Sequence, residues 1–282
     1  MDAVLLKSFL EVYRSRHFGH AAKNLFISQS AVSARIKQLE DELGIQLFTR
    51  ERNNIALTTA GKKFLPYAEN ILNTWNKARL EISIPNDTET LLSVAALPSL
   101  WDIFLDDWIN WVDNNKFATA LQIDAMQSDA LMRNLLDGTL DLGFVLSPPK
   151  TPEILVMEIQ PVPLVMVTNK PSVSLEQALN GNYVYVDWGT EFGMLHARLF
   201  HDMNPPRLRA NVSRVALSLL NSCDGAAYLP EATVQDQLGS TLFLVENAPL
   251  IQKEAYALYA HKSSKKEVIE QALTWFDTNK NQ

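Results

Sequence analysis

The stretch Ser28–Gly44, SQSAVSARIKQLEDELG, decides the fold of the amino-terminal part of the chain. At about 100° per residue, its polar and apolar side chains fall in two neighbouring quadrants of a helix. The polar quadrant holds Gln29, Ser30, Ser33 and Lys37, and the apolar quadrant holds Val32, Ile36, Leu39 and Leu43. Ser28 is a suitable N-cap and Gly44 a suitable stop. We therefore predict a helix that buries one narrow stripe and presents short polar groups and a lysine to a groove.

A shorter helix is predicted immediately upstream, over residues 18–27 (FGHAAKNLFI), preceded by an amphipathic helix over residues 2–16. Ala21, Ala22 and Leu25 have the spacing that lets a second helix pack tightly across the shorter one. A short helix, a turn and a longer helix with a polar leading end make a helix-turn-helix, whose second helix enters the DNA major groove. Two packed helices without a DNA role are the alternative, but they would not require the Gln-Ser-x-x-Ser leading end.

The pattern AA-x-x-L-x-x-S-Q-S-A-V-S-x-x-I-x-x-L-E-x-x-L-G-x-x-L-F-x-R, followed by L-T-x-x-G, stands between Ala21 and Gly61. It resembles the N-terminal signature of the LysR-type transcriptional regulators. The resemblance implies a bacterial regulator that binds double-stranded operator or promoter DNA. Within that family, the segment ERNNIALTTAGKKFLPYAENILNTW is most similar to the HdfR branch of enterobacterial regulators, which implies control of motility or neighbouring genes.

Several side chains of the predicted second helix suit base recognition. Gln29 can pair with adenine, Ser30 and Ser33 can bond to bases or phosphate, and Lys37 suits guanine or phosphate. Ser28, at the helix start, is included among the DNA contacts. Arg35 lies across the apolar stripe, so we assign it to phosphate or to a carboxylate within the protein. The family often has a basic residue where this chain has Ala34, so the resemblance does not imply that DNA contact in this chain.

A hairpin is predicted next, with strands over Leu47–Thr49 and Ile55–Leu57 and the sequence RERNN at its tip. Arg50, Arg52 and Asn53 would make this hairpin a wing that touches the sugar-phosphate backbone or the adjacent minor groove. A solvated turn is the alternative. Lys62 and Lys63, at the start of the following helix, are further candidates for phosphate contact.

A long helix is predicted from Thr59 to about Ile84. Its apolar residues are separated by 4, 3, 4, 3 and 4 positions, which is a heptad seam: Phe64, Ala68, Ile71, Trp75, Ala78 and Ile82. The family resemblance implies that this helix pairs two subunits, giving a homodimer or a homotetramer. A helix that faces the protein's own core is the alternative. Pro66 should kink the helix near its start.

After residue 90 strands and helices alternate, which predicts right-handed βαβ units in a parallel sheet. The arrangement resembles the two-lobe, periplasmic-binding-protein-like effector domain of the same family. We expect an α/β effector domain preceded by an all-α winged helix-turn-helix domain and a long linker helix. The predicted bounds are 1–58 for the DNA-binding domain, 59–88 for the linker and dimerisation helix, and 89–282 for the effector domain, with lobe I at about 89–160 and 263–282 and lobe II at about 161–262.

Ligand sites in such sheets lie at the loops outside the carboxyl ends of the strands. Ser99, Ser128 and Ser213 are predicted to open helices there, where helix N-termini favour an anion. Trp101 and Trp188 would cover the apolar part of a ligand or partly fill the cleft. We therefore expect a small anionic or amphipathic effector. Three ordinary N-caps around a cleft without an effector are the alternative.

The bulk composition is acidic, with a formal net charge of −7, but the charge is unevenly distributed. Residues 1–65 hold ten Lys or Arg against six Asp or Glu, and residues 66–282 hold fifteen against twenty-six. A basic head on an acidic body suits a DNA-reading domain attached to one that stays off DNA. A single cysteine, Cys223, excludes an internal disulfide and is expected to be a buried small hydrophobe. We see no signal peptide or membrane span, and expect a cytoplasmic protein.

Enzyme classes lack support in this sequence, which has no G-x-S-x-G, Walker or G-x-G-x-x-G motif. His196 and His201 are five residues apart, on different faces of a helix, and are expected to be surface histidines rather than metal ligands. No cofactor or metal is predicted. The rival interpretation is a small-molecule-binding or transport-related protein with a vestigial head; the basic head and its intact leading helix argue against it.

Overall fold

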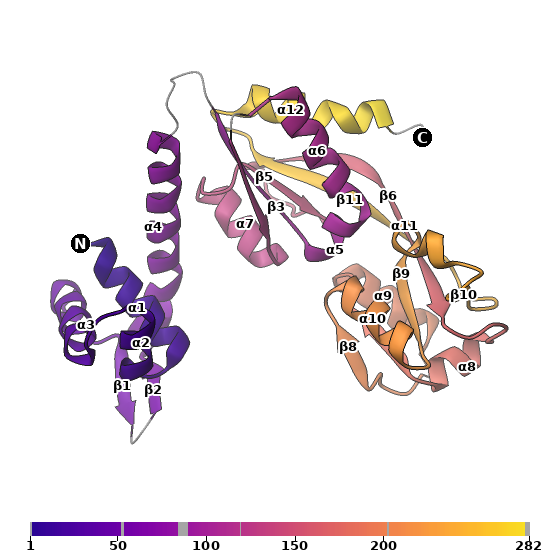
Figure 1. Cartoon of the computed structure of the whole chain (residues 1–282), viewed down its shortest axis with the longest axis horizontal. Helices are drawn as coiled ribbons and strands as arrows, with labels where there is room; N and C mark the ends of the chain where they lie inside the picture. Colours follow the sequence, from indigo (N-terminus) through magenta and orange to yellow (C-terminus); the bar gives the residue numbers. More distant parts are fainter. Residues whose placement is uncertain (1, 52–53, 84–89, 119, 202, 280–282) are drawn as a thin grey trace. The chain divides into compact units, whose positions relative to one another are not determined.

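The computed structural model describes residues 2–51, 54–83, 90–118, 120–201 and 203–279 (Figure 1). The chain divides into two compact units, residues 1–89 and 90–282. The long helix that the sequence predicts as a separate linker therefore belongs to the same unit as the DNA-binding head.

The first unit holds three helices, a two-stranded hairpin and the long helix: α1 (Ala3–Ser15), α2 (Phe18–Asn24), α3 (Gln29–Leu43), β1 (Phe48–Glu51), β2 (Asn54–Leu57) and α4 (Thr59–Ser83). Its core is built around Phe9, whose ring lies 5.2 Å from that of Phe48 and 5.3 Å from that of Phe64. The α3 stripe joins this core through Val32, Ile36 and Leu39. Leu43, predicted to belong to the stripe, is 40% exposed, because it is the last residue of the helix and extends past the core.

The helix predicted over 18–27 ends earlier, at Asn24. Phe26 adopts a left-handed backbone conformation with φ of 55°, which an α-helix does not permit. Leu25 and Ile27, on either side, pack against the head core. The turn of the helix-turn-helix is therefore held in place by its own apolar residues. The hairpin strands also extend further than predicted, with Phe48 opposite Leu57 and Glu51 opposite Asn54.

The second unit is built on one mixed sheet of nine strands in the order β4-β3-β5-β11-β6-β9-β7-β8, with β10 beside β6. The strands are β3 (Leu91–Ala96), β4 (Ala120–Ala125), β5 (Leu142–Val145), β6 (Ile154–Thr168), β7 (Tyr183–Val186), β8 (Leu208–Ala210), β9 (Ala226–Pro230), β10 (Phe243–Leu244) and β11 (Ile251–Ala260). As predicted, β3 pairs with its neighbours in parallel, and so does β7.

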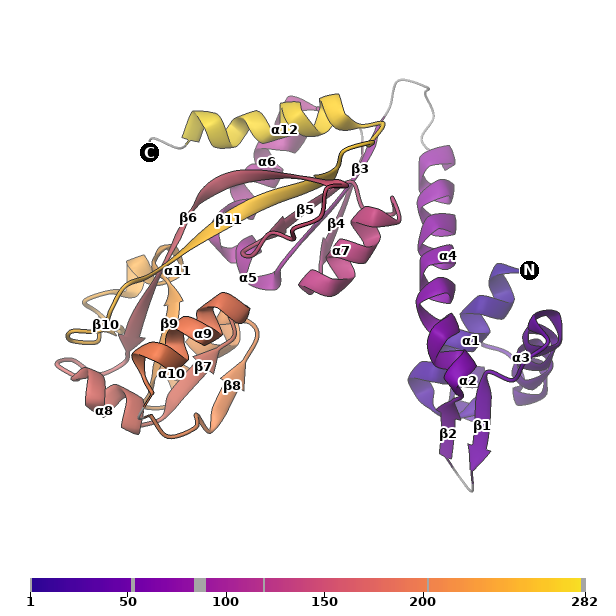
Figure 2. The same cartoon turned by 180° about the vertical axis from the view of Figure 1, so that it is seen from behind.

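Two long antiparallel strands, β6 and β11, run side by side from one lobe to the other (Figure 2). Both are longer than the segments PVPLVMVT (161–168) and EAYALYAH (254–261), whose composition favours strands. The first half of β6 alternates buried and less buried side chains, and Glu158, Gln160 and Pro161 interrupt its apolar residues, which weakens the strand pattern in the sequence. These two strands join the lobes within the second unit.

Helices cover both faces of the sheet in the first lobe. Successive strand residues point to opposite faces, so Val94 and Ala96 pack with α6 (Asp106–Asn115) and α12 (Lys266–Asn279), whereas Ala95 packs with α7 (Ser128–Leu136). Trp108 is fully buried between α6 and α12, and its Nε1 donates a hydrogen bond to the carbonyl oxygen of Ala272, 2.8 Å away.

The remaining helices are α5 (Pro98–Leu100), the π-helical segment η1 (Trp101–Leu105), α8 (Leu175–Asn180), α9 (Thr190–Leu199), α10 (Ser213–Ser222), α11 (Glu231–Val234) and the 3-10 segment η2 (Gln235–Gln237). The segment SLWDIFLDDWINWV (99–112), whose apolar spacing favours one helix, is thus the run α5–η1–α6, with a π-helical segment in it.

Candidate nucleic-acid interface and ligand cleft

The leading end of α3 combines a fixed backbone with exposed polar side chains. The Ser28 hydroxyl accepts a hydrogen bond from the backbone N–H of Ala31, at 3.2 Å, and lies 2.9 Å from the Ser30 hydroxyl. Gln29, Ser30 and Lys37 are exposed, and Ser33 is half-buried. The predicted N-cap is confirmed, and so is the stop at Gly44, which has φ of 68°. Ser28 is therefore primarily a structural cap, whereas Gln29 is free to reach a partner molecule.

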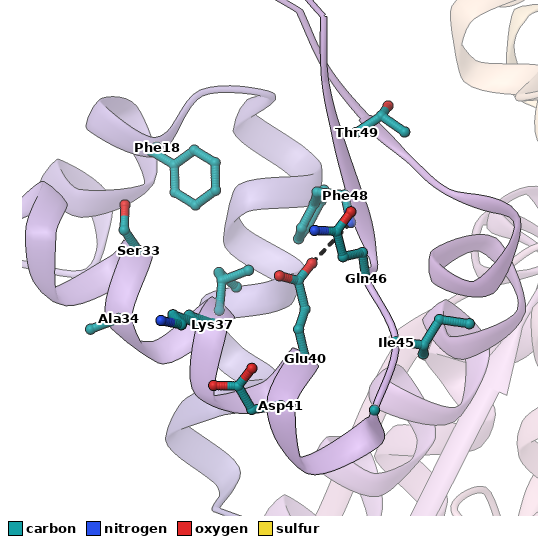
Figure 3. Close-up of a pocket in the computed structure, with 12 residues that line it drawn as sticks. Phe18, Ser33, Ala34, Lys37, Glu40, Asp41, Ile45, Gln46, Phe48 and Thr49 are labelled. Carbon is teal, nitrogen blue, oxygen red and sulfur yellow. Dashed lines mark hydrogen bonds between the residues drawn. The ribbon is translucent and has the colours of Figure 1, made fainter.

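The other half of α3 faces the wing across a groove of about 980 Å³ (Figure 3). Ser33, Lys37 and Glu40 line it from the helix, and Gln46 and Thr49 from the hairpin side. The Glu40 carboxylate accepts hydrogen bonds from the backbone N–H groups of Leu47, at 2.7 Å, and Phe48, at 3.2 Å. Glu40 thereby ties the base of the wing to α3, a role that our reading of the sequence did not identify although its Leu-Glu signature contains this residue.

Arg35 is half-buried, and no carboxylate forms an ion pair with it among the residues that the structure describes. Of its two predicted partners, phosphate is the one we retain as a proposal. Arg50 lies in β1, with a side chain outside the described atoms, and Arg52 and Asn53 lie outside the described residues.

The Leu-Thr-x-x-Gly part of the signature positions the start of α4. Thr58 donates its hydroxyl hydrogen to the carbonyl oxygen of Gln46, at 2.8 Å, and accepts from the backbone N–H of Gly61, at 2.9 Å. A Cβ atom at Gly61 would lie 2.2 Å from the carbonyl oxygen of Leu47, so only glycine permits this close approach. Lys62 and Lys63 follow directly and are exposed.

The predicted seam of α4 has two different environments. Ala68 is fully buried and Phe64 is half-buried, and both pack into the head core. This corrects the assignment of Ala68 as a dimer contact, because its surface is fully covered within one chain, whereas Phe64 keeps part of its surface exposed. Ile71, Trp75 and Ile82 are 41%, 52% and 84% exposed, and Ala78 is half-buried. The helix runs through Pro66 as a single element.

In the second unit, a cleft of about 500 Å³ opens between the lobes. Ser99, Ser128 and Trp188 are among its lining residues, but Trp101 and Ser213 are not. Trp101 packs instead, partly buried, against the main core. Trp188 is buried, and its Nε1 donates a hydrogen bond to the carbonyl oxygen of Tyr228, at 3.2 Å.

None of the three predicted serine caps forms. The N-cap positions belong to Leu97, Gln127 and Val212, none with a side-chain cap bond, and the serines lie within the helices that follow. Ser99 and Ser213 are buried, and the Ser99 hydroxyl accepts a hydrogen bond from the backbone N–H of Ser213, at 3.2 Å. These two serines therefore join the lobes, as does an ion pair between Asp102 and Arg214.

The charged groups that line the cleft are carboxylates: Asp129, Asp187 and Glu191. Asp129 and Glu191 occupy the first turns of α7 and α9, where they offset the positive ends of those helices. The buried Lys253 ammonium donates to Glu191 at 2.9 Å, and this hydrogen bond and charge hold the pKa of Glu191 below its ordinary value. No Lys or Arg is among the described lining residues, which argues against the anionic effector that the sequence led us to expect.

Comparisons with known proteins address both units. The model of the "Bacterial regulatory helix-turn-helix protein, lysR family" matches residues 4–62, and that of the "LysR substrate binding domain" matches residues 85–279. The chain belongs to the LysR family. It is therefore a LysR-type transcriptional regulator, with a DNA-binding head and an effector-binding domain.

Among individual LysR-type relatives, the HTH-type transcriptional regulator HdfR of Escherichia coli O17:K52:H18 is 37% identical over 276 residues, covering 97% of both chains. HdfR of Yersinia enterocolitica serotype O:8 is 34% identical over 282 residues, covering 97% of this chain and 95% of the relative. The crystal structure of CbnR, a LysR family transcriptional regulator, has the same fold, with a TM-score of 0.77 at 19% identity over 98% of this chain and 99% of CbnR.

Two further expectations about this LysR family member are wrong. His196 is buried rather than on the surface, in an aromatic cluster with Phe192, Phe200 and Tyr228, and its Nε2 lies 2.8 Å from the Tyr183 hydroxyl. Burial, with a smaller contribution from the Arg209 charge, lowers the pKa of His196 from 6.5 to about 4. Cys223 is exposed rather than buried, because it follows the last residue of α10.

Within the described ranges, no group of three or more His, Cys, Asp or Glu side chains is placed to hold a metal ion. Among the helices built from those ranges, none combines the length and apolar character needed to cross a bilayer.

Proposed function

We propose that the regulator recognises its operator through the leading end of α3, with Gln29, Ser30, Ser33 and Lys37 as the groove contacts. One observation carries this proposal: exposed polar side chains at the start of α3 stand on a helix whose opposite stripe is buried in the head core. Ser28, Arg35, the wing residues Arg50, Arg52 and Asn53, and the α4 residues Lys62 and Lys63 would contact the sugar-phosphate backbone.

The rival, a small-molecule-binding protein with a vestigial head, is not retained. A head that had lost its role would be free to lose its cap, its buried stripe and its tethered wing. The chain keeps the Ser28 cap, the Glu40 tether and the close approach at Gly61. We also propose, from the resemblance to the HdfR branch, that the regulator controls motility or neighbouring genes; the identities of 34% and 37% to HdfR proteins support the assignment to that branch.

The operator proposal is tested by selecting duplexes from fragmented genomic DNA with the wild-type protein, followed by footprinting and by binding titrations at several salt concentrations. Gln29→Ala should weaken specific binding by ~1–3 kcal/mol and leave non-specific binding nearly intact. Lys63→Ala, the matched phosphate variant, should weaken both and flatten the dependence on salt. If Gln29→Ala binds the selected site like the wild type, the base-reading role is wrong.

For the cleft, we propose a small ligand with an amine or neutral hydrogen-bonding groups. The carboxylates Asp129 and Asp187 and the absence of Lys or Arg among the described lining residues support a cation over an anion; the third carboxylate, Glu191, is already paired with Lys253. Trp188 offers an apolar wall. The helix N-termini are the counter-argument, but acidic residues in their first turns offset them.

The effector class is tested by thermal shift, using amines and carboxylic acids that share one carbon skeleton. Amines should raise the melting temperature of the wild type, and Asp129→Asn should reduce the shift. Ser99→Ala is a poor probe, since it leaves the buried N–H of Ser213 without an acceptor and costs ~1–3 kcal/mol of stability by itself. Shifts produced by the acids alone would restore the anionic effector.

A further inference from the structure

Phe26, in the turn between α2 and α3, combines two unfavourable features. Its side chain is 94% exposed, the highest value among the large hydrophobic residues that the structure describes. Its φ of 55° lies in the left-handed region, which a bulky side chain rarely adopts and which Asn or Gly tolerates better. Neither feature stabilises the free protein, and the ring is available to contact a partner outside the chain.

The turn holds the ring in a defined position. Leu25 and Ile27, the two neighbours of Phe26, pack against the head core. The backbone N–H of Phe26 donates to the carbonyl oxygen of Lys23, at 3.1 Å, and that of Ile27 donates to the carbonyl oxygen of Ala22, at 3.0 Å. The ring therefore projects from an anchored backbone, which lowers the entropy lost when it contacts a partner.

The surroundings of Phe26 indicate which partner it meets. Ser28, two residues further on, caps α3, and Gln29 and Ser30 are exposed at its leading end. Lys23, three residues earlier, is exposed as well. The ring thus stands in the chain between a cationic side chain and the end of the helix assigned to the major groove.

We propose that Phe26 contacts the 5-methyl group of a thymine in the operator, beside the base that Gln29 reads; this rests on the operator-binding proposal above. The thymine methyl is the apolar group that base edges offer in the major groove, and an aromatic ring suits it because both are desolvated on contact. The contact would add sequence preference without adding charge.

The test uses a duplex that the wild-type protein selects from a random-sequence library. Each thymine is replaced, one at a time, by deoxyuridine, which removes only the methyl group. Wild-type Kd should rise three- to tenfold at one thymine in each half-site. Phe26→Asn should bind the unmodified duplex three- to tenfold more weakly than the wild type, and should be indifferent to the loss of that methyl. The dependence of its Kd on salt should be unchanged.

Three controls separate a DNA contact from a structural role. Phe26→Asn suits a left-handed backbone, so its melting temperature should equal or exceed that of the wild type. Phe26→Tyr keeps the ring and should keep the methyl sensitivity. Leu136→Asn removes an apolar side chain that is also 52% exposed, at the end of α7 in the second unit, and should leave Kd and methyl sensitivity unchanged.

The inference is overturned if the wild type and Phe26→Asn respond alike to every deoxyuridine, or if Phe26→Asn melts below the wild type. A third outcome contradicts this inference alone: the wild type binds the duplex and Gln29→Ala binds it more weakly, but no effect of a thymine methyl group depends on Phe26. Failure of the wild type to select any duplex contradicts the operator-binding proposal instead.

Discussion

The two halves of α4 carry one heptad pattern but have different neighbours. In the first half, Ala68 and Leu72 are buried and Phe64 packs against Phe9 of α1. In the second half, Trp75 and Ile82 are 52% and 84% exposed within the single chain. A regular apolar spacing therefore identifies the face of a helix that packs, but does not identify what packs against it.

The physical reason lies in the geometry of helix packing. A helix presents the same 3–4 spacing of side chains to any partner, whether that partner belongs to its own domain or to a second subunit. Leu72 is the last residue of α4 in the described head core, and α4 continues to Ser83. We propose that the seam residues not buried in the head core, Ile71, Trp75, Ala78 and Ile82, pair with a second copy of the chain.

The largest expected effect comes from a charge in the first half. Ala68→Glu places a carboxylate in the head core, where it has neither water nor a basic partner among the described core residues. The head should lose ~4 kcal/mol or more of its free energy of unfolding, or fail to fold. Chemical denaturation followed by circular dichroism measures this loss.

The matched control is Ala78→Glu, the same substitution in the second half, at a half-buried position. It should leave the fold of the head intact and act on subunit association instead. Equal unfolding in both variants would show that the two halves do not differ.

A charge in the second half should break the assembly without unfolding the chain. Trp75→Glu replaces a large apolar side chain with a carboxylate at the proposed subunit contact, once in each of two subunits. The dimer Kd should rise at least 100-fold, equivalent to ~3 kcal/mol, and operator affinity should fall with it. Sedimentation equilibrium gives the mass, with Asn76→Glu, at an exposed neighbouring position, as the control. An unchanged mass for Trp75→Glu would exclude pairing through this face.

Low pH should destabilise the second unit without affecting the subunit contact proposed for α4. Because burial lowers the folded-state pKa of His196 from 6.5 to about 4, the unfolded chain binds more protons between these values. The free energy of unfolding is therefore highest above about pH 6.5, where His196 is neutral in both states, and it falls as the pH approaches 4. At pH 5 the loss should amount to ~1–2 kcal/mol.

The measurement compares urea denaturation at pH 7.5 and pH 5 for the wild type and for His196→Phe, which cannot be protonated. The pH-dependent loss should shrink in the variant, while the dimer that α4 is proposed to form should persist at pH 5. A dimer that dissociates in parallel with the acid loss of stability would place the subunit contact elsewhere.

The smallest effect is expected at the end of α4. Ile82 is 84% exposed, so it has the least cover within its own chain. Ile82→Ala should raise the dimer Kd about fivefold, ~1 kcal/mol, since it removes apolar area without introducing charge. Analytical ultracentrifugation of this variant and of Trp75→Glu compares how much each position contributes to the dimer Kd. An Ile82→Ala effect as large as that of Trp75→Glu would mean that the contact is centred at the end of the helix.

Local chemistry made α3 predictable. Ser28, the apolar stripe of Val32, Ile36 and Leu39, and Gly44 each act within a few residues, so the helix, its cap and its stop all follow from neighbouring positions. The serines of the second unit were not predictable in the same way. A serine before an apolar run resembles a cap, but capping requires an extended backbone one residue before the helix, and Ser99 and Ser213 lie inside theirs.

The sequence by itself determined the helix-turn-helix, the alternation of strands and helices, and the family, because hydrophobic period and short polar motifs are properties of neighbouring residues. Only the tertiary structure decided which half of α4 is core, that Ser99 joins the lobes, that carboxylates line the cleft and that His196 is buried. Each of these depends on residues far apart in the chain, such as Ser99 and Ser213. Their proximity is set by the packing of whole elements, which no local pattern records.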